Sequence, residues 1–446
     1  MVDPALVVAP AAVRAGVNAT AGPTRKAILA ATIGNALEFY DFITYGFFSI
    51  QVGRAFFPAH SEYASLMLSL GLFGAGFVAR PIGGIVIGAY ADRVGRRPAM
   101  MLSFALMGLA IIGLACIPSY AAIGIVAPIL AVIARLVQGF SLGGEVGPTT
   151  AYLMEAADSR RRGLTVSWQG ASQGLAGTVA ALVGFTLSSL LPPAALDAYG
   201  WRVAFLLGAV TLPYGLWLRR NLPETLHTPE PAGTVAAADS ESRGALMAAS
   251  RRVLLLGLLV ISAGSIASSV SSYMTTFAQH ALHMRPSLAF AGGVISSLSG
   301  VIGYLGGGWL SDRVGRRPVM IAPALAHLLV MIPVFYWIVE ARSGTALLVG
   351  AAINGVLAGS GASAFYAAMT ESLPKRIRSG SFAAIYAIAN AIFGGTTQLI
   401  VTWLTHATGS TMAPVGYMFV AAMVGIVARW LIVESAPAKA RLGPSA

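Results

Sequence analysis

The hexapeptide DRVGRR occurs twice in this chain, at Asp92–Arg97 and at Asp312–Arg317. The flanking residues repeat with it, since GAYADRVGRRPAMM begins at Gly88 and GWLSDRVGRRPVMI begins at Gly308. Because only 10% of the residues are charged, a charged string of this length is not expected to recur by composition alone. The repeat therefore indicates that the chain contains two copies of one structural unit.

A second pair of residues supports the duplication. Glu155 and Arg162 return as Glu371 and Arg378, at an offset of 216 residues. The longest polar stretch, residues 219–252, lies between the two copies and is rich in Pro, Ala, Ser and acidic residues, which is typical of a linker. We expect one unit on each side of it, at residues 27–218 and 253–433, with tails at residues 1–26 and 434–446.

The composition is that of a membrane protein. Of the 446 residues, 56% are hydrophobic, and the mean hydropathy is +0.75. Apolar stretches of 18 or more residues are long enough to cross a bilayer as helices. The sequence predicts twelve such spans: residues 27–50, 62–90, 98–117, 121–153, 164–190, 202–218, 253–279, 287–310, 319–339, 345–370, 380–404 and 413–433.

The basic residues predict how these spans are oriented. With the amino terminus inside the cell, four arginines fall on the outer side, two lie within spans, and the remaining 23 of the 29 Lys and Arg residues face the cytoplasm. This distribution follows the positive-inside rule and accounts for the net charge of +12 without a nucleic-acid partner. We expect both termini in the cytoplasm, no cleaved signal peptide, and no disulfide, since Cys116 is the single cysteine.

Ionisable residues inside a membrane are costly and are functional candidates by default. We place five in the first half and none in the second: Glu38, Asp41, Arg80, Arg135 and Glu145. Counted along the helical rise, Glu38, Arg80 and Glu145 lie roughly 15 to 18 Å from the cytoplasmic ends of their spans. Three charges from three helices should therefore meet near the bilayer midplane.

These charges suggest proton coupling. A carboxylate in a partly desolvated cavity takes up a proton more readily than one in water. We predict Asp41 as the proton carrier, with Glu38 second and Glu145 third, while Arg80 or Arg135 would attract an anionic substrate. A static ion-pair network that orients the helices is the alternative.

Polar residues on the same helix faces are candidate substrate ligands. In the first half these are Asn35, Tyr45, Gln138, Gln169 and Gln173. In the second half, Asn354 begins a Gly-rich face, and helical spacing places Tyr386, Asn390 and Thr397 together. Gln398 lies off that face, so its role stays open. We expect His327 to be a buried structural residue, and His280 and His283 to lie near the outer mouth.

Several motifs carry a family resemblance. They are GNALEFYDF at residues 34–42, RPIGG at 80–84, RLVQGFSLGGE at 135–145, GWRVAFLLGA at 200–209 and IFGGTTQ at 392–398, besides the two DRVGRR loops. Together they resemble the metabolite:proton symporter branch of the major facilitator superfamily. The resemblance implies an all-α membrane fold, with twelve helices in two pseudo-symmetric six-helix bundles around a central cavity.

The resemblance also assigns a role to the repeated loops. It implies a cytoplasmic latch that holds the two halves together when the protein is closed on the inside. The latch residues would be Asp92, Arg93 and Arg96 in the first copy, Asp312, Arg313 and Arg316 in the second, and the partners Glu155, Arg162, Glu371 and Arg378.

The resulting expectation is a secondary active transporter of a bacterial inner membrane, acting as a monomer. Residues 394–414 resemble the citrate and tricarballylate symporters most, which favours proton-coupled uptake of a tricarboxylate. A dicarboxylate such as 2-oxoglutarate, a zwitterion such as betaine or proline, an exporter and a non-transporting sensor stay open. The sequence contains no P-loop, nucleophile motif or metal-binding cluster, so we expect no enzyme activity, cofactor or metal.

Overall fold

The computed structural model describes residues 25–59, 61–94, 96–143, 160–210 and 246–436, together with residues 150, 153, 154, 157, 158 and 213. Within these residues the regular structure is helical and no strand is present, which confirms the all-α prediction. Each of the twelve predicted spans contains a described helix. Eight helices are long and apolar enough to cross a membrane. The predicted linker at residues 219–252 and the two tails lie mostly outside the described residues.

In five of the first six spans, the main helix begins or ends close to the limit predicted from the sequence. The described helices are α1 (Arg25–Phe47), α2 (Ser49–Phe56), α3 (Glu62–Val94), α4 (Arg96–Cys116), α5 (Tyr120–Ile123), α6 (Val126–Leu142), α8 (Arg162–Leu190), α9 (Pro193–Ala195), the π-helical turn η1 (Leu196–Gly200) and α10 (Trp201–Ala209). The first span is split, because α1 and α2 are separate helices on either side of Phe48.

The second half consists of longer helices. They are α13 (Arg251–His280), α14 (Pro286–Val314), α15 (Arg316–Ala341), α16 (Gly344–Ser372), α17 (Lys375–Ala389), the π-helical turn η2 (Asn390–Gly394), α18 (Gly395–Thr408) and α19 (Ala413–Trp430). Between α14 and α15 the second DRVGRR copy turns at Gly315, whose φ is +113°. Side chains rarely adopt that conformation, so the turn favours glycine at this position.

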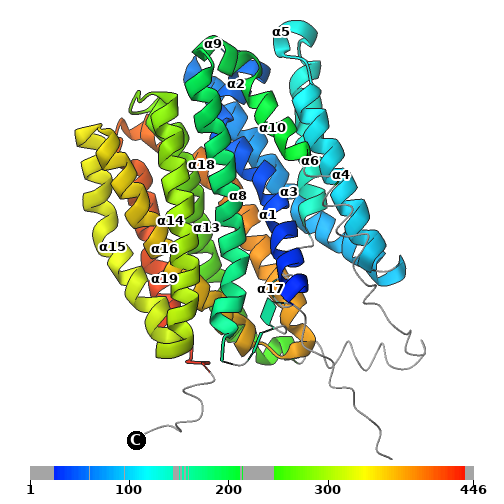
Figure 1. The fold of residues 1–446 in the computed structure, drawn as a ribbon, viewed down its shortest axis with the longest axis vertical. Helices are drawn as coiled ribbons and strands as arrows, with labels where there is room; N and C mark the ends of the chain where they lie inside the picture. The colour runs from blue at the N-terminus through cyan, green and yellow to red at the C-terminus, as the bar shows by residue number, and fades with distance from the viewer. Residues whose placement is uncertain are drawn as a thin grey trace, which may run out of the picture.

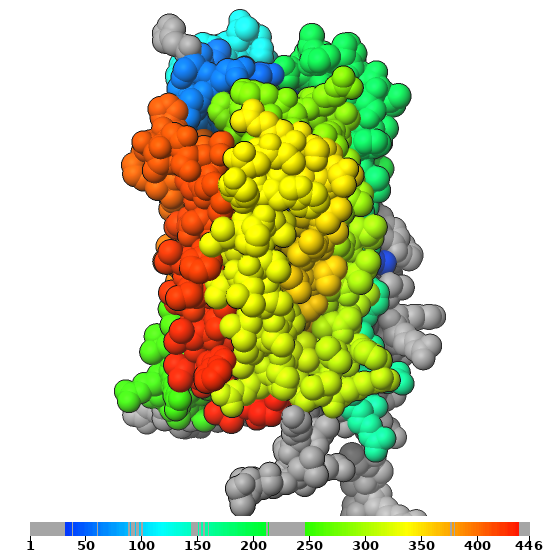
Figure 2. All heavy atoms as spheres, turned by 90° about the vertical axis from the view of Figure 1, so that its left-hand side faces the viewer, coloured from blue at the N-terminus to red at the C-terminus, as the bar shows by residue number. Residues whose placement is uncertain are grey.

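The helices run between two ends of an elongated bundle (Figure 1), with α2, α5 and α9 at one end and the α14–α15 turn at the other. We call the latter the DRVGRR end. The flank formed by α15, α16 and α19 is continuous in Figure 2. It exposes large apolar side chains such as Leu329 (75%) and Val420 (65%), as expected of a surface that faces lipid.

The two halves meet along a seam between α8 and α14, which we call the glycine seam. It consists of glycines seven residues apart on α8, at 163, 170, 177 and 184, and the α14 residues that face them, at 308, 304, 297 and 290. An added Cβ would lie 2.1 Å from the ring of Tyr304 at Gly170 and 2.3 Å from the ring of Phe290 at Gly184. A seven-residue period keeps one stripe of an α-helix against its partner.

The halves also touch at both ends of the bundle. Near the DRVGRR end, Leu153 and Met154 of the first half form a buried cluster with Ala367 of the second. At the opposite end, the rings of Tyr63 and His406 stack with centroids 3.9 Å apart. The described parts of the two halves are therefore in contact at both ends of the bundle.

The glycine seam predicts opposite effects for two identical substitutions. Adding a methyl group where packing is already full costs about 1–3 kcal/mol. Gly163→Ala would overpack the seam at the DRVGRR end and favour the state that is open there. Gly184→Ala would favour the state that is open at the opposite end. Ala362 and Ser272 both line the cavity described below. The alkylation rates of Ala362→Cys and Ser272→Cys, each in a Cys116→Ala background, measure the populations of the two open states.

Gly113→Ala on α4 is the matched control, because no atom lies within 4 Å of an added Cβ at that position. It should leave both alkylation rates unchanged. Equal rates in all three glycine variants would show that the seam does not control access.

Candidate functional site

A central cavity of about 280 Å³ lies between the two halves. The first half lines it with Phe39, Phe42, Phe73, Phe77, Arg80 and Gln173, and the second half with serines of α13 and with Tyr304, His327, Asn354, Tyr386, Asn390, Gln398 and Arg429. The first-half wall is thus largely aromatic, whereas the second-half wall is rich in hydrogen-bonding groups. Among the described residues that line the cavity, the charged ones are Arg80 and Arg429, and none is a carboxylate.

Arg80 reaches the cavity between aromatic rings. Its guanidinium carbon lies 4.2 Å from the ring centre of Phe77 and 4.6 Å from that of Phe42, which holds the cation by its attraction to the ring faces. Tyr386 of the second half interacts with it electrostatically. No described carboxylate forms an ion pair with Arg80, so its charge remains available to an anion in the cavity.

Asp41 and Arg135 lie behind this aromatic wall. Both are 1% exposed, and neither lines the cavity. The two charges interact electrostatically, but no described group donates a hydrogen bond to either carboxylate oxygen of Asp41. Arg135 donates to the side chain of Gln138, and its guanidinium carbon lies 4.3 Å from the ring centre of Tyr45. The structure therefore brings Arg80, but not Arg135, to the cavity.

Four further predicted ligands of the first half are also inside the bundle rather than on the cavity wall. Asn35 and Gln169 bind each other and join α1 to α8, with Gln169 Nε2 donating to Asn35 Oδ1 over 3.1 Å. Tyr45 donates its hydroxyl to the carbonyl of Ser69 over 3.0 Å, and Gln138 accepts from Arg135. These partners make them parts of a structural network.

The side chains of Glu38 and Glu145 lie outside the described residues, and so do those of Asp92, Arg93, Arg96 and Glu155. Their predicted roles stay predictions.

The helix face predicted to line the cavity in the span at residues 380–404 is wrong by one residue. Helical spacing placed Thr397 with Tyr386 and Asn390, but the cavity is lined by Gln398 instead. The cause is η2, because a π-helical turn inserts an extra residue into the helix and rotates everything after it. Gln398 is 1% exposed, and neither its amide nitrogen nor its amide oxygen has a described hydrogen-bond partner. It is therefore free to bind a ligand.

The expectation that intramembrane charge is confined to the first half is also wrong. Arg429, near the end of α19, lines the cavity from the second half. His327 is buried, as predicted, but it lines the cavity and pairs through Nε2 with Oδ1 of Asn354. Gly425, one turn before Arg429, lets α19 pack closely on α13, since an added Cβ would lie 2.7 Å from the Cβ of Ala263.

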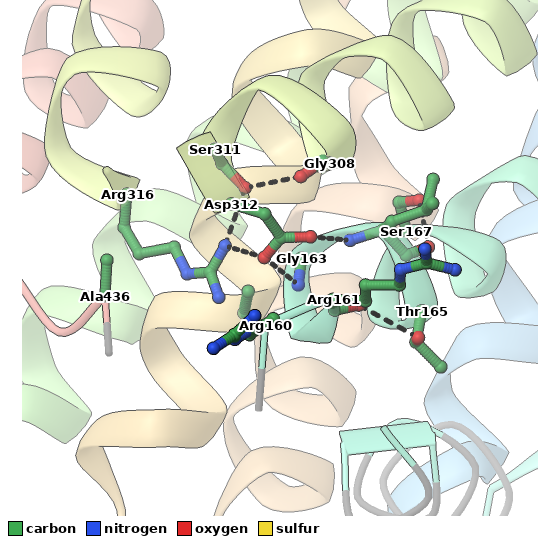
Figure 3. Close-up of polar contacts among 12 residues, drawn as sticks. Arg160, Arg161, Gly163, Thr165, Ser167, Gly308, Ser311, Asp312, Arg316 and Ala436 are labelled. Carbon is green, nitrogen blue, oxygen red and sulfur yellow. Dashed lines mark hydrogen bonds and ion pairs between the residues drawn. The ribbon is translucent and has the colours of Figure 1, made fainter. Parts of the chain in front are cut away.

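The second DRVGRR copy, where the latch is predicted, joins the two halves by hydrogen bonds (Figure 3). Asp312 accepts hydrogen bonds from the backbone N–H groups of Gly163 (2.7 Å) and Leu164 (2.9 Å) at the start of α8. A carboxylate is favoured there, because the first N–H groups of a helix lack partners and carry partial positive charge. One half thus caps a helix of the other.

Arg316 holds this carboxylate in place. It is fully buried and donates to Asp312 over 2.7 Å and to Glu371 over 2.9 and 3.1 Å. Three of the predicted second-copy latch residues therefore form one network. Arg313 instead stacks on Trp309 at 3.9 Å, and Arg378 donates to the carbonyl of Leu373.

Arg162 makes no described contact with this network, and its Nε is buried without a described hydrogen-bond partner. The structure therefore does not bring it to the Asp312 network as a donor.

Comparison with known proteins identifies the family. Residues 31–321 and 293–446 match the family model described as the Major Facilitator Superfamily. The citrate-proton symporter of Salmonella typhi is 37% identical over 94% of both chains, and that of Klebsiella pneumoniae is 38% identical over 92% of both. The alpha-ketoglutarate permease of Escherichia coli (strain K12) is 33% identical over 85% of this chain and 88% of its own.

A solved structure of similar fold is that of a D-xylose-proton symporter. It aligns with a TM-score of 0.74 over 92% of this chain and 98% of that chain, at 19% sequence identity. This match supports the fold alone, which has the two-bundle architecture predicted from the sequence. The chain is a multi-pass membrane transporter rather than an enzyme, and it belongs to the Major Facilitator Superfamily.

Proposed function

We propose that this protein takes up a small tricarboxylate, citrate or tricarballylate, together with protons by alternating access. The observation that carries the proposal is the charge of the cavity: its charged lining residues are two arginines, and no described carboxylate lines it. A guanidinium group binds a carboxylate through two parallel hydrogen bonds. The two relatives with 37% and 38% identity are citrate-proton symporters, which supports the same substrate class.

Alternative substrates differ in how they match this charge. A dicarboxylate such as 2-oxoglutarate would also pair with arginine, and a permease for that compound is 33% identical. A zwitterion such as betaine or proline carries a cationic group, for which the described cavity wall offers aromatic rings but no carboxylate. Two cations and no described acid therefore favour an anion. An exporter or a sensor of the same fold would share the cavity but not the coupled uptake.

Proton coupling is assigned to Asp41. An ionised carboxylate that is buried without hydrogen bonds is costly, and protonation removes the charge. The nearby Arg135 favours the ionised form, so the two groups leave both protonation states accessible. Glu38 and Glu145 are further candidates for this relay.

The membrane potential explains why uptake of an anion has to be coupled to protons. Moving each net charge across the membrane is worth about 2.3 kcal/mol per 100 mV. An anion entering a cell that is negative inside therefore needs protons to offset its charge. We propose a bacterial inner-membrane protein with both termini in the cytoplasm, functional as a monomer.

The latch gives a mechanism for alternating access. In this proposal the DRVGRR end is cytoplasmic, and the Asp312 network is made when that side is closed. The duplication suggests that Asp92 caps the start of α17 in the same way. Arg93, Arg96 and Glu155 would complete the first-copy latch.

Uptake into proteoliposomes tests the transport function directly. With an acidic exterior, we expect radiolabelled citrate to accumulate, and accumulation to stop when a protonophore removes the pH gradient. Excess citrate or tricarballylate should compete, 2-oxoglutarate should compete more weakly, and betaine should not compete. Accumulation that ignores the pH gradient, or competition by betaine alone, would contradict the proposal.

Asp41→Asn should separate coupling from binding. The amide keeps the size of the carboxyl group but cannot exchange a proton, so we expect pH-driven accumulation to be lost while citrate exchange across the membrane continues. Asp197→Asn is the control, because that acid pairs with Arg54 near the end opposite DRVGRR. Full pH-driven accumulation by Asp41→Asn would assign proton coupling to another residue.

Asp312→Asn should open the DRVGRR end. It weakens two hydrogen bonds to α8 and the ion pair with buried Arg316, and hydrogen bonds to charged groups are each worth about 1.5–3 kcal/mol. We expect the alkylation rate of Ala362→Cys from the cytoplasmic side to rise roughly 10- to 100-fold, which corresponds to the net loss of about one such hydrogen bond, because the amide keeps part of each contact. Glu340→Gln, a surface substitution with the same charge change, should leave this rate unchanged, and an equal rate in Asp312→Asn would argue against the latch.

A further inference from the structure

Arg429 lies in an unusual place for a cation at the end of a membrane helix. Arginines in such positions normally extend toward water and leave only their apolar stems in the membrane. Here Nη1 lies 3.7 Å from where a Cβ would stand at Gly425, one turn back along α19. The side chain therefore runs into the bundle and reaches the cavity wall.

Nothing described in the protein neutralises this charge. No described carboxylate forms an ion pair with Arg429, and its Nε is buried without a hydrogen-bond partner. The carbonyl of Trp430 at the end of α19 already accepts a hydrogen bond from Arg317 over 3.0 Å, so Arg429 is not needed to cap this helix end. A buried cation without a partner is costly, which indicates that its partner is a molecule bound in the cavity.

Two neutral groups from other helices adjoin it. His327 on α15 interacts with Arg429 electrostatically, and it pairs with Asn354 on α16. Because Asn354 uses its Oδ1 for this pairing, its amide nitrogen remains as a donor. All three residues line the same cavity. The cluster thus offers a guanidinium and neutral hydrogen-bonding groups, a set suited to a carboxylate.

We propose that Arg429, His327 and Asn354 form a second carboxylate subsite, and that Arg80 binds another carboxylate of the same molecule. This inference rests on the proposed function and extends it from an anion to a polycarboxylate. Arg80 belongs to the first half and Arg429 to the second. A ligand with two or three carboxylates bridges the halves, whereas a ligand with one carboxylate leaves one arginine unpaired.

Equilibrium binding to the purified full-length protein tests this subsite. The probes are citrate, with three carboxylates, and butyrate, with one. We expect Arg429→Gln to weaken citrate binding roughly 10- to 100-fold, as removal of a bidentate charged pair should, and to weaken butyrate binding much less, because a single carboxylate can still bind at Arg80. Arg429→Lys should recover part of the citrate affinity, because lysine restores the positive charge but not the two parallel hydrogen bonds of a guanidinium group.

Arg317→Gln is the matched control, since it removes an arginine of α15 that contacts the same end of α19 but does not line the cavity. It should bind citrate as the wild type does. Monodisperse elution and an unchanged melting temperature without ligand check that Arg429→Gln is folded, and Arg429→Lys provides a second variant if it is not.

Two outcomes overturn the subsite. One is citrate affinity within about twofold of wild type in Arg429→Gln, and the other is an equal fold loss for citrate and butyrate. In either case normal citrate uptake by the wild-type protein leaves the proposed function intact. A wild-type protein that does not bind citrate overturns both proposals.

Discussion

The glycine seam between α8 and α14 is the constraint on which the rest of the structure depends. Glycines at seven-residue intervals let two long helices from different halves lie against each other from one end of the bundle to the other. Any larger residue would hold the halves apart, and the cavity walls would then not face each other. The seam thus fixes the distance across which a ligand must bind both halves.

The latch is built on the same seam. Gly163, its last glycine at the DRVGRR end, lets Gly308 approach, and its own N–H donates to Asp312. In the proposed mechanism, close packing and charge capping would therefore form or break together when that end closes or opens. This explains why the repeated string combines a glycine four residues before the acid with an arginine four residues after it. The glycine permits contact, the acid caps the helix, and the arginine holds the acid.

The sequence predicted the architecture well, because span length and the position of charge depend on composition alone. It also placed Arg80 correctly at the cavity. The sequence prediction failed where local backbone and side-chain geometry determines which residues line the cavity. Because of the π-helical turn before Gly395, Gln398 rather than Thr397 lines the cavity. A prediction that assumes 3.6 residues per turn throughout the helix cannot anticipate such a turn. Arg429 was assigned to the cytoplasm because helix ends usually face water, yet its side chain turns inward. Arg135 shares a helix face with Gln138, but aromatic rings separate it from the cavity.

The described charges also suggest why substrate and proton are bound together. With Asp41 ionised, it offsets Arg135, and the cavity keeps the two positive charges of Arg80 and Arg429. A bound citrate trianion would exceed them by one negative charge, and a proton on Asp41 would remove that excess. Each ligand then favours the other, since coupling between two sites is reciprocal.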